Sequence, residues 1–203
     1  MGCHGCRERV GGVDDSVDAF VFEPASQSVD ATHPFAATMT AHAAEVCAEL
    51  QMPYLVLARP AWATGDAKVV ASDTEAAETV AQQGYSRVFL TNGRSGVKAF
   101  ADSEAWFLIR AVTAPDAALL PRHHQLLLSR GPYRYDDELA VLRKHRIDSL
   151  VTKNSGGDMT RGKLDAAAAL AIPVVMVARP KLPIGVTAVG SVEAAAEWVA
   201  VLG

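Results

Sequence analysis

Short apolar runs alternate with longer alanine-rich stretches along most of this chain. The apolar runs are rich in β-branched residues and predict strands at Gln27–Ala31, Tyr54–Ala58, Arg87–Leu90, Trp106–Ala111, Gln125–Leu128, Ser149–Thr152 and Val174–Ala178. The stretches between them carry apolar residues at spacings of three and four, and predict helices at Thr38–Leu50, Ala76–Gln83, Asp136–His145, Lys163–Ala171 and Val192–Val201. This alternation is typical of an α/β protein with mainly parallel sheets.

Two segments of the chain resemble each other. VDATHPFA, a helix and PYLVLARP form the first, and LVTKNSGG, a helix and PVVMVARP form the second. Alanine-rich helices and valine-rich strands are alike in any α/β protein, and proline commonly ends a strand, so composition alone is an alternative explanation. The repeated Ala-Arg-Pro favours two lobes of similar topology, residues 1–66 and 67–203, divided near the loop at Gly65 and Asp66.

The ends of the predicted strands indicate where a ligand would bind. In open parallel sheets the ligand crevice lies beyond the carboxyl ends of the strands. If the two lobes face each other, one central cleft is expected to receive four polar residues: His33, Arg59, Asn154 and Arg179.

Three glycine-containing loops follow predicted strands: TNGRSG at 91–96, SRGPY at 129–133 and TKNSGG at 152–157. Glycine permits close backbone approach, and the start of a following helix favours an anion. None of the loops matches the dinucleotide fingerprint, and each alone is also explained as a simple turn. Together with the cations Arg130 and Lys153, they favour a phosphorylated or dinucleotide ligand.

The segment DATHPFA places Asp30, Thr32 and His33 at the end of an apolar strand. His33 could donate a hydrogen bond or a proton to a ligand while Asp30 orients the loop. Alternatively, Asp30 and Thr32 cap the following helix and His33 packs between elements. The sequence leaves both interpretations open.

Composition excludes several classes of protein. Lys and Arg number 19 against 23 Asp and Glu, and no basic block is interleaved with aromatic residues, so we expect no nucleic-acid partner. No apolar run reaches the roughly 18 residues of a membrane-spanning helix, and no hydrophobic leader is visible, so we expect no membrane association and a cytoplasmic location. Cys3 and Cys6 form a C-x-x-C pair, but no second ligand pair accompanies it, so we expect no metal site.

Several of these motifs together resemble the precorrin-6A reductase family of cobalamin biosynthesis. They are DATHPFA, the two strands ending in ARP, FLTNG, SRGPY, and VTKNSGG followed by KLDAAAALAIPVVMVARP. The likeness runs from about Gly11 to the C-terminal helix. It implies two Rossmann-like lobes around a cleft, NADPH as hydride donor, and a tetrapyrrole-derived macrocycle as acceptor: precorrin-6A or its cobalt form, reduced to precorrin-6B.

The resemblance also implies roles for the candidate residues. Thr32 and His33 would be the catalytic residues, and with Asp30 they would lie beside the macrocycle. Arg59 and Arg179 would bind its acetate and propionate carboxylates. The cofactor would contact Thr91, Asn92, Gly93, Arg130, Lys153, Asn154, Ser155 and Gly156.

The start of the chain departs from the family pattern. Family members normally open with a strand, a glycine-rich turn, a helix and a second strand, whereas this sequence begins only at a segment resembling the Val-Gly-Gly that comes next in the family. We therefore expect an exposed sheet edge that favours a homodimer. Two alternatives are a two-lobed lyase resembling uroporphyrinogen-III synthase, which needs no nicotinamide, and a remnant that binds a ligand without reducing it.

Overall fold

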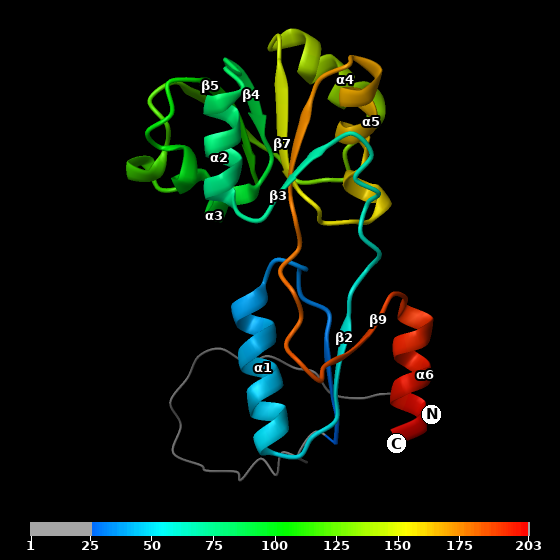
Figure 1. Cartoon of the computed structure of the whole chain (residues 1–203). Helices are drawn as coiled ribbons and strands as arrows, with labels where there is room; N and C mark the ends of the chain where they lie inside the picture. The colour runs from blue at the N-terminus through cyan, green and yellow to red at the C-terminus, as the bar shows by residue number, and fades with distance from the viewer. Residues whose placement is uncertain (1–25, 203) are drawn as a thin grey trace, which may run out of the picture.

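The computed structural model describes residues 26–202, which form two α/β lobes joined by two extended segments (Figure 1). The predicted α/β class with mainly parallel sheets is confirmed, because every strand pair in both sheets is parallel. No helix within residues 26–202 is long and apolar enough to cross a membrane. The Cys3–Cys6 pair lies outside the described residues.

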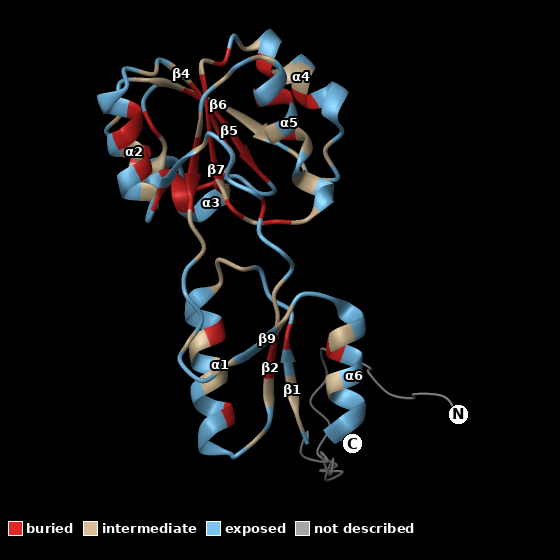
Figure 2. Ribbon diagram, turned by 45° about the vertical axis from the view of Figure 1, so that its right-hand side comes forward, coloured by how far each residue is buried: buried red, intermediate tan, exposed pale blue. Residues whose placement is uncertain are grey.

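The smaller lobe contains a three-stranded sheet in the order β1-β2-β9. Its strands are β1 (Ser28–Asp30), β2 (Tyr54–Leu57) and β9 (Thr187–Val189), and they lie between helices α1 (Ala37–Glu49) and α6 (Val192–Leu202) (Figures 1 and 2). Two strands and one helix would leave a face of this sheet uncovered. The last strand and helix of the chain supply that cover, so the smaller lobe includes residues beyond the expected division at residue 66.

The larger lobe contains a six-stranded sheet in the order β3-β8-β7-β4-β5-β6. Its strands are β3 (Lys68–Val70), β4 (Arg87–Leu90), β5 (Trp106–Ala111), β6 (His124–Leu128), β7 (Ser149–Lys153) and β8 (Val174–Val177). The helices are α2 (Asp73–Gln82), the short α3 (Gly93–Gly96), α4 (Tyr135–Lys144) and α5 (Gly162–Ala169). Three 3-10 turns, η1 (Val97–Phe100), η2 (Ala117–Leu119) and η3 (Asp158–Thr160), complete it.

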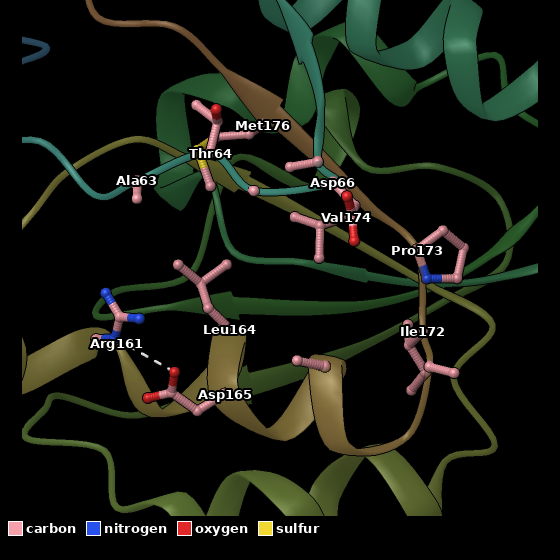
Figure 3. A pocket seen from close by; sticks show the side chains of 14 residues that line it. Ala63, Thr64, Asp66, Arg161, Leu164, Asp165, Ile172, Pro173, Val174 and Met176 are labelled. Carbon is pink, nitrogen blue, oxygen red and sulfur yellow. Dashed lines mark hydrogen bonds and ion pairs between the residues drawn. The ribbon is translucent and has the colours of Figure 1, made fainter.

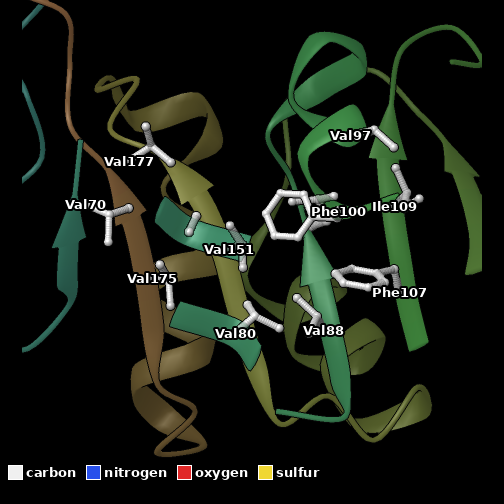
Figure 4. Close-up of a cluster of buried hydrophobic side chains, with 12 residues drawn as sticks. Val70, Val80, Val88, Val97, Phe100, Phe107, Ile109, Val151, Val175 and Val177 are labelled. Atoms are coloured by element: carbon white, nitrogen blue, oxygen red, sulfur yellow. The ribbon is translucent and has the colours of Figure 1, made fainter. Parts of the chain in front are cut away.

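The six-stranded sheet is buried on both faces, as its nearly continuous apolar strands require. One face packs against α2 and η1 in a cluster that includes Val88, Phe100 and Ile109 (Figure 4). The other face packs against α4 and α5 through Phe89 and Leu150. Burial is concentrated in this lobe (Figure 2), so most of the buried apolar core belongs to the six-stranded sheet and its helices.

The connections that leave β4 and β7, which are neighbours in the sheet, diverge. The chain after β4 passes through α3 and η1 on one face, and the chain after β7 passes through α5 on the other. In open α/β sheets the usual ligand crevice lies at the carboxyl ends of two strands whose connections separate in this way. We refer to this position at the ends of β4 and β7 as the β4/β7 crevice. The loops at 91–96 and 154–157 flank this crevice.

Candidate active site

The two lobes meet at the carboxyl ends of their strands, since the joining segments begin directly after β2 and β8. Arg179, which follows β8, donates from Nε to the main-chain oxygen of Asn154 at 2.8 Å and from Nη1 to that of Arg59 at 2.6 Å. Its Nη2 donates to the oxygens of Pro60 and Ser155. Desolvation, and then the charge of Arg59, lower the pKa of Arg179. Its guanidinium therefore joins the two lobes through main-chain oxygens.

Arg59, the equivalent residue after β2, donates from Nε to the main-chain oxygen of Ser155 at 2.9 Å, and its side chain is otherwise exposed. Gly156 allows the loop to pass close to Pro60 and Arg179. It has a φ of +68°, and a Cβ atom there would overlap the main-chain oxygen of Pro60 and Nη2 of Arg179. The glycine-rich loop at 152–157 is thus shaped by its contact with the lobe junction.

Asn154 also belongs to the junction. Its Oδ1 accepts from the main-chain nitrogen of Trp62 at 2.9 Å, and its Nδ2 donates to the oxygen of the same residue at 3.1 Å. The Trp62 indole donates to the oxygen of Gly157 and lies 4.8 Å from Nζ of Lys163. Sequence reasoning gave neither residue a place in the site, because Trp62 lies outside the repeated segments and Lys163 was assigned only to the start of a predicted helix.

Asp30 organises the loop that follows β1. Its carboxylate accepts hydrogen bonds from the main-chain nitrogen of Thr32 at 2.8 Å, from the hydroxyl of Thr40 at 2.7 Å and from the hydroxyl of Tyr54 at 2.9 Å. Burial raises the pKa of Asp30, but these hydrogen bonds outweigh burial and hold the pKa below its ordinary value. Burial and the neighbouring Asp30 carboxylate raise the pKa of Tyr54. The carboxylate thus stays ionised and fixes the conformation of residues 30–32.

Thr32 and His33 line a cavity of about 490 Å³ at the carboxyl ends of the smaller sheet. Desolvation, followed by the positive charges of Arg59, Lys153 and Arg179, lowers the pKa of His33. The main-chain nitrogen of Phe35 donates to Nδ1 of His33 at 3.2 Å, so the neutral ring carries its proton on Nε2. His33 therefore presents a hydrogen-bond donor at neutral pH.

The same cavity contains Gly190, Ser191 and Glu193 from the far end of the chain. Ser191 caps α6, since its hydroxyl accepts from the main-chain nitrogen of Ala194 at 3.2 Å. The sequence Gly-Ser before an alanine-rich helix signals such a cap. Its place in the smaller lobe could not be expected, because the short strand β9 was not predicted.

Seven of the eight predicted cofactor residues lie at the end of β7 or in the segments that follow β4 and β7: Thr91, Asn92, Gly93, Lys153, Asn154, Ser155 and Gly156. The hydroxyl of Thr91 donates to the main-chain oxygen of Val151 at 3.1 Å and ties the first loop to β7. Arg130 follows β6 at the far edge of the sheet, where its side chain is exposed. Within residues 26–202 no hydrogen bond or ion pair connects Arg130 to the crevice.

A larger cavity of about 640 Å³ lies away from these loops (Figure 3). It runs along α5, with Leu164, Val174 and Met176 in its wall and the ion pair of Arg161 with Asp165 at 3.2 Å beside it. None of the predicted site residues lines it. Among the residues that the structure describes, no group of three or more His, Cys, Asp and Glu side chains is arranged to hold a metal ion.

Residues 5–200 match the family model described as Precorrin-6x reductase CbiJ/CobK. The chain belongs to this family. It is 72% identical over 172 residues to the precorrin-6A reductase of Mycobacterium tuberculosis (strain ATCC 25618 / H37Rv), covering 85% of this chain and 70% of that protein. It is 50% identical over 196 residues to the precorrin-6A reductase of Rhodococcus erythropolis, covering 95% of this chain and 78% of that protein.

A solved structure, CobK precorrin-6A reductase, matches with a TM-score of 0.80 and 31% identity, over 88% of this chain and 74% of that one. The family expected from DATHPFA and VTKNSGG is therefore confirmed, together with the fold class. As a member of the precorrin-6x reductase family, the chain is an oxidoreductase that acts on a carbon–carbon double bond. These matches do not favour the alternative of a two-lobed lyase.

Proposed function

We propose that this enzyme reduces metal-free precorrin-6A to precorrin-6B by hydride transfer from NADPH. The single observation that carries the proposal is the family match over residues 5–200. The relatives from Mycobacterium tuberculosis and Rhodococcus erythropolis are both named for precorrin-6A without cobalt, which favours the metal-free macrocycle as substrate. In such a reaction the cofactor supplies the hydride, and the protein supplies position and electrostatics.

The β4/β7 crevice is suited to the cofactor. Gly93 has a φ of +71° and begins α3, and Oδ1 of Asn92 is buried without a hydrogen-bond partner among the described residues. A buried acceptor without a partner is costly unless a ligand donor satisfies it. We assign Thr91, Asn92, Gly93 and the 153–156 loop to the cofactor, with Arg130 as an outlying member of the set.

The cavity at Thr32 and His33 is suited to one edge of the macrocycle, which carries many carboxylates. Exposed nitrogens of Arg59 lie beside it to bind a carboxylate. The imidazolium form of His33 would give a proton to the macrocycle, whereas the neutral ring would donate only a hydrogen bond from Nε2–H. Asp30 would hold Thr32 and His33 in place. Arg179 holds Arg59 at the junction through the hydrogen bond from Nη1 to the main-chain oxygen of Arg59. A contact between Arg179 itself and the substrate stays a prediction.

The cytoplasmic location and the homodimer expected from the sequence also stay proposals. A cytoplasmic enzyme has direct access to NADPH. Within the described residues β1 is an outer strand of its sheet, and an open edge favours pairing with a second copy. Sedimentation of the purified chain tests the oligomeric state.

Titration of the purified chain with NADPH and NADH tests the proposed cofactor, with nucleotide fluorescence and thermal unfolding as readouts. A ligand that binds the native state must raise its stability by mass action. We expect saturable, NADPH-selective binding, followed by loss of NADPH absorbance when precorrin-6A is added. A folded chain that binds neither nucleotide would contradict the proposal.

A further inference from the structure

Four polar side chains from three segments of the larger lobe meet in the β4/β7 crevice. Nδ2 of Asn92 donates to Oδ1 of Asp73 at 2.6 Å. Oδ2 of Asp73 lies 3.5 Å from Nζ of Lys153, which also lies 3.5 Å from the hydroxyl oxygen of Ser95. We call Asp73, Asn92, Ser95 and Lys153 the crevice cluster. Its acidic member, Asp73, was not among the residues expected from the sequence.

The fold holds this cluster closely. Asp73 is the first residue of α2, which starts there because Ser72 caps the helix by accepting from the main-chain nitrogen of Glu75. Asn92 is only 4% exposed. A Cβ atom on Gly96 would lie 2.8 Å from Cβ of Asn92 and 3.0 Å from Oδ1 of Asp73, so only glycine lets the backbone pass this close.

Two members of the cluster, Asp73 and Asn92, have acceptor atoms that are not fully used. Oδ1 of Asn92 is buried and has no partner among the described residues. The Asp73 carboxylate can accept more hydrogen bonds than the one from Asn92, since an ionised carboxylate has about four acceptor positions. A ligand that satisfies these atoms must bring N–H or O–H donors.

The charges of Asp73 and Lys153 determine whether the cluster favours a phosphate or an uncharged donor group. If Lys153 bound a phosphate, the phosphate would lie within a few ångströms of Asp73. Two like charges at this separation near a protein surface repel each other substantially. Asp73 already compensates the charge of Lys153, so the cluster favours an uncharged donor group over a phosphate.

Contacts between the smaller lobe and the crevice cluster indicate which end of the nucleotide would bind there. Phe35, from the loop after β1, packs against the core of the larger lobe, and its ring centroid lies 5.3 Å from Nζ of Lys153. The Phe35 ring is also 5.9 Å from the ring of His33. The cluster thus adjoins the lobe junction, where a hydride must be delivered to the macrocycle.

We propose that Asp73 and Asn92 form the subsite for the uncharged donors of the nicotinamide–ribose end of the cofactor, and that Lys153 serves to hold Asp73 in place. The donors are either the carboxamide N–H or the hydroxyls of the adjoining ribose. The phosphates are then bound elsewhere in the crevice. This inference rests on the proposed use of NADPH.

The test compares NADPH binding by the wild-type chain, Asp73→Asn and Asp165→Asn. The last variant is a matched control, because it removes the same charge at an exposed position on α5. We expect Asp73→Asn to weaken NADPH binding about tenfold, since a hydrogen bond to a charged group contributes about 1.5 kcal/mol or more. Asp165→Asn should leave the Kd unchanged. A phosphate beside Lys153 would give the opposite sign, because Asp73→Asn would then tighten binding.

Binding of a second ligand shows which part of the nucleotide is affected by Asp73→Asn. Adenosine 2′,5′-bisphosphate has the adenosine end and its phosphates but lacks the nicotinamide and its ribose. We expect Asp73→Asn to leave its Kd within twofold of the wild-type value, and equal weakening for both ligands would overturn the proposal. The 3-acetylpyridine analogue of NADPH separates the two donors: Asp73→Asn weakens its binding if the ribose hydroxyls are the donors, and leaves it unchanged if the carboxamide is.

Asn92→Ala provides an independent variant that changes no charge. It should also weaken NADPH binding while leaving the bisphosphate unaffected, and circular dichroism confirms that each variant is folded. If wild-type protein does not bind NADPH, the proposed cofactor is wrong and the subsite is lost with it. If the wild type binds NADPH, and Asp73→Asn and Asn92→Ala bind it equally well or better, only the subsite is wrong.

Discussion

Nη1 of Arg179 donates to the main-chain oxygen of Arg59, 2.6 Å away across the junction of the two lobes. The two residues occupy the same place in the repeated Ala-Arg-Pro unit, and each also donates to the main-chain oxygen of Ser155. The repeat therefore ends in one shared hydrogen-bond network rather than in two separate binding sites.

Arg179→Lys should destabilise the protein by about 2–3 kcal/mol, because a lysine cannot reproduce hydrogen bonds from Nε, Nη1 and Nη2 to separate main-chain oxygens. Urea unfolding measures the change. Arg143→Lys on the exposed surface of α4 is the control and should leave stability unchanged. Unchanged stability in Arg179→Lys, with a raised KM for precorrin-6A, would show instead that this guanidinium mainly binds substrate.

A comparison of Gly156→Ala with Gly185→Ala separates the free-energy cost of a positive φ from the cost of steric overlap by the added Cβ atom. Both glycines have positive φ, but only Gly156 has neighbours that a Cβ atom would overlap. Gly185→Ala should cost about 1 kcal/mol for the left-handed conformation. Gly156→Ala should cost clearly more in the same denaturation experiment and should lower NADPH affinity. Equal costs at the two positions would mean that the contact with Pro60 contributes nothing.

Much of the fold was predictable from the sequence, because long apolar runs and helical spacing reflect burial directly. The two β-loop-α-β repeats are confirmed as parallel pairs, β1 with β2 and β7 with β8. The strands β3 and β9 were missed. Each has only three residues and lies at the edge of its sheet, and unlike the equally short β1 neither belongs to a repeated segment. Their pairing depends on partners far along the chain, which no local pattern indicates.

The sequence predicts a location for the candidate site but not its contacts. Strand ends and glycine-rich loops assign the cofactor to the ends of β4 and β7, and this assignment stays a prediction. The partners of Arg59 and Arg179 are main-chain oxygens of the junction, and their positions depend on the packing of the two lobes. Asp73 escaped notice because it follows β3, the strand that was not predicted.

Lys163→Met should change how stability depends on pH. Burial lowers the pKa of Lys163 to about 8 in the folded protein, against an ordinary value of 10.5. Between these values the unfolded chain binds more protons, so wild-type stability rises with pH and the cost of burying the charge applies fully below pH 8. Relative to Lys163→Met, the wild type should gain about 3 kcal/mol between pH 7.5 and 10.5.

Urea unfolding of both proteins at several pH values measures this difference, and other titrating groups cancel in the comparison. A constant difference across the range would contradict a buried, desolvated Lys163. Lys144→Met at the exposed end of α4 is the control and should show no such trend.

His33→Asn should lower kcat for precorrin-6A reduction on the order of 100-fold if the Nε2–H of His33 assists protonation of the macrocycle. Because the pKa of His33 is lowered and only its imidazolium form is an effective acid, the wild-type rate should rise as the pH falls below 6.5, and this rise should disappear in the variant. Steady-state kinetics across the acidic range provide the measurement. An unchanged kcat with a raised KM would restrict His33 to substrate binding.

The return of β9 and α6 to the smaller lobe determines the order in which the molecule can be completed on the ribosome. The six-stranded sheet uses residues 68–177, so all its strands are available before translation ends. The smaller sheet must wait for residues 187–202, although its first strands were translated long before. Until those residues emerge, β1, β2 and α1 lack the cover that β9 and α6 provide, and a premature stop after residue 186 would leave a finished larger lobe attached to a smaller lobe without that cover.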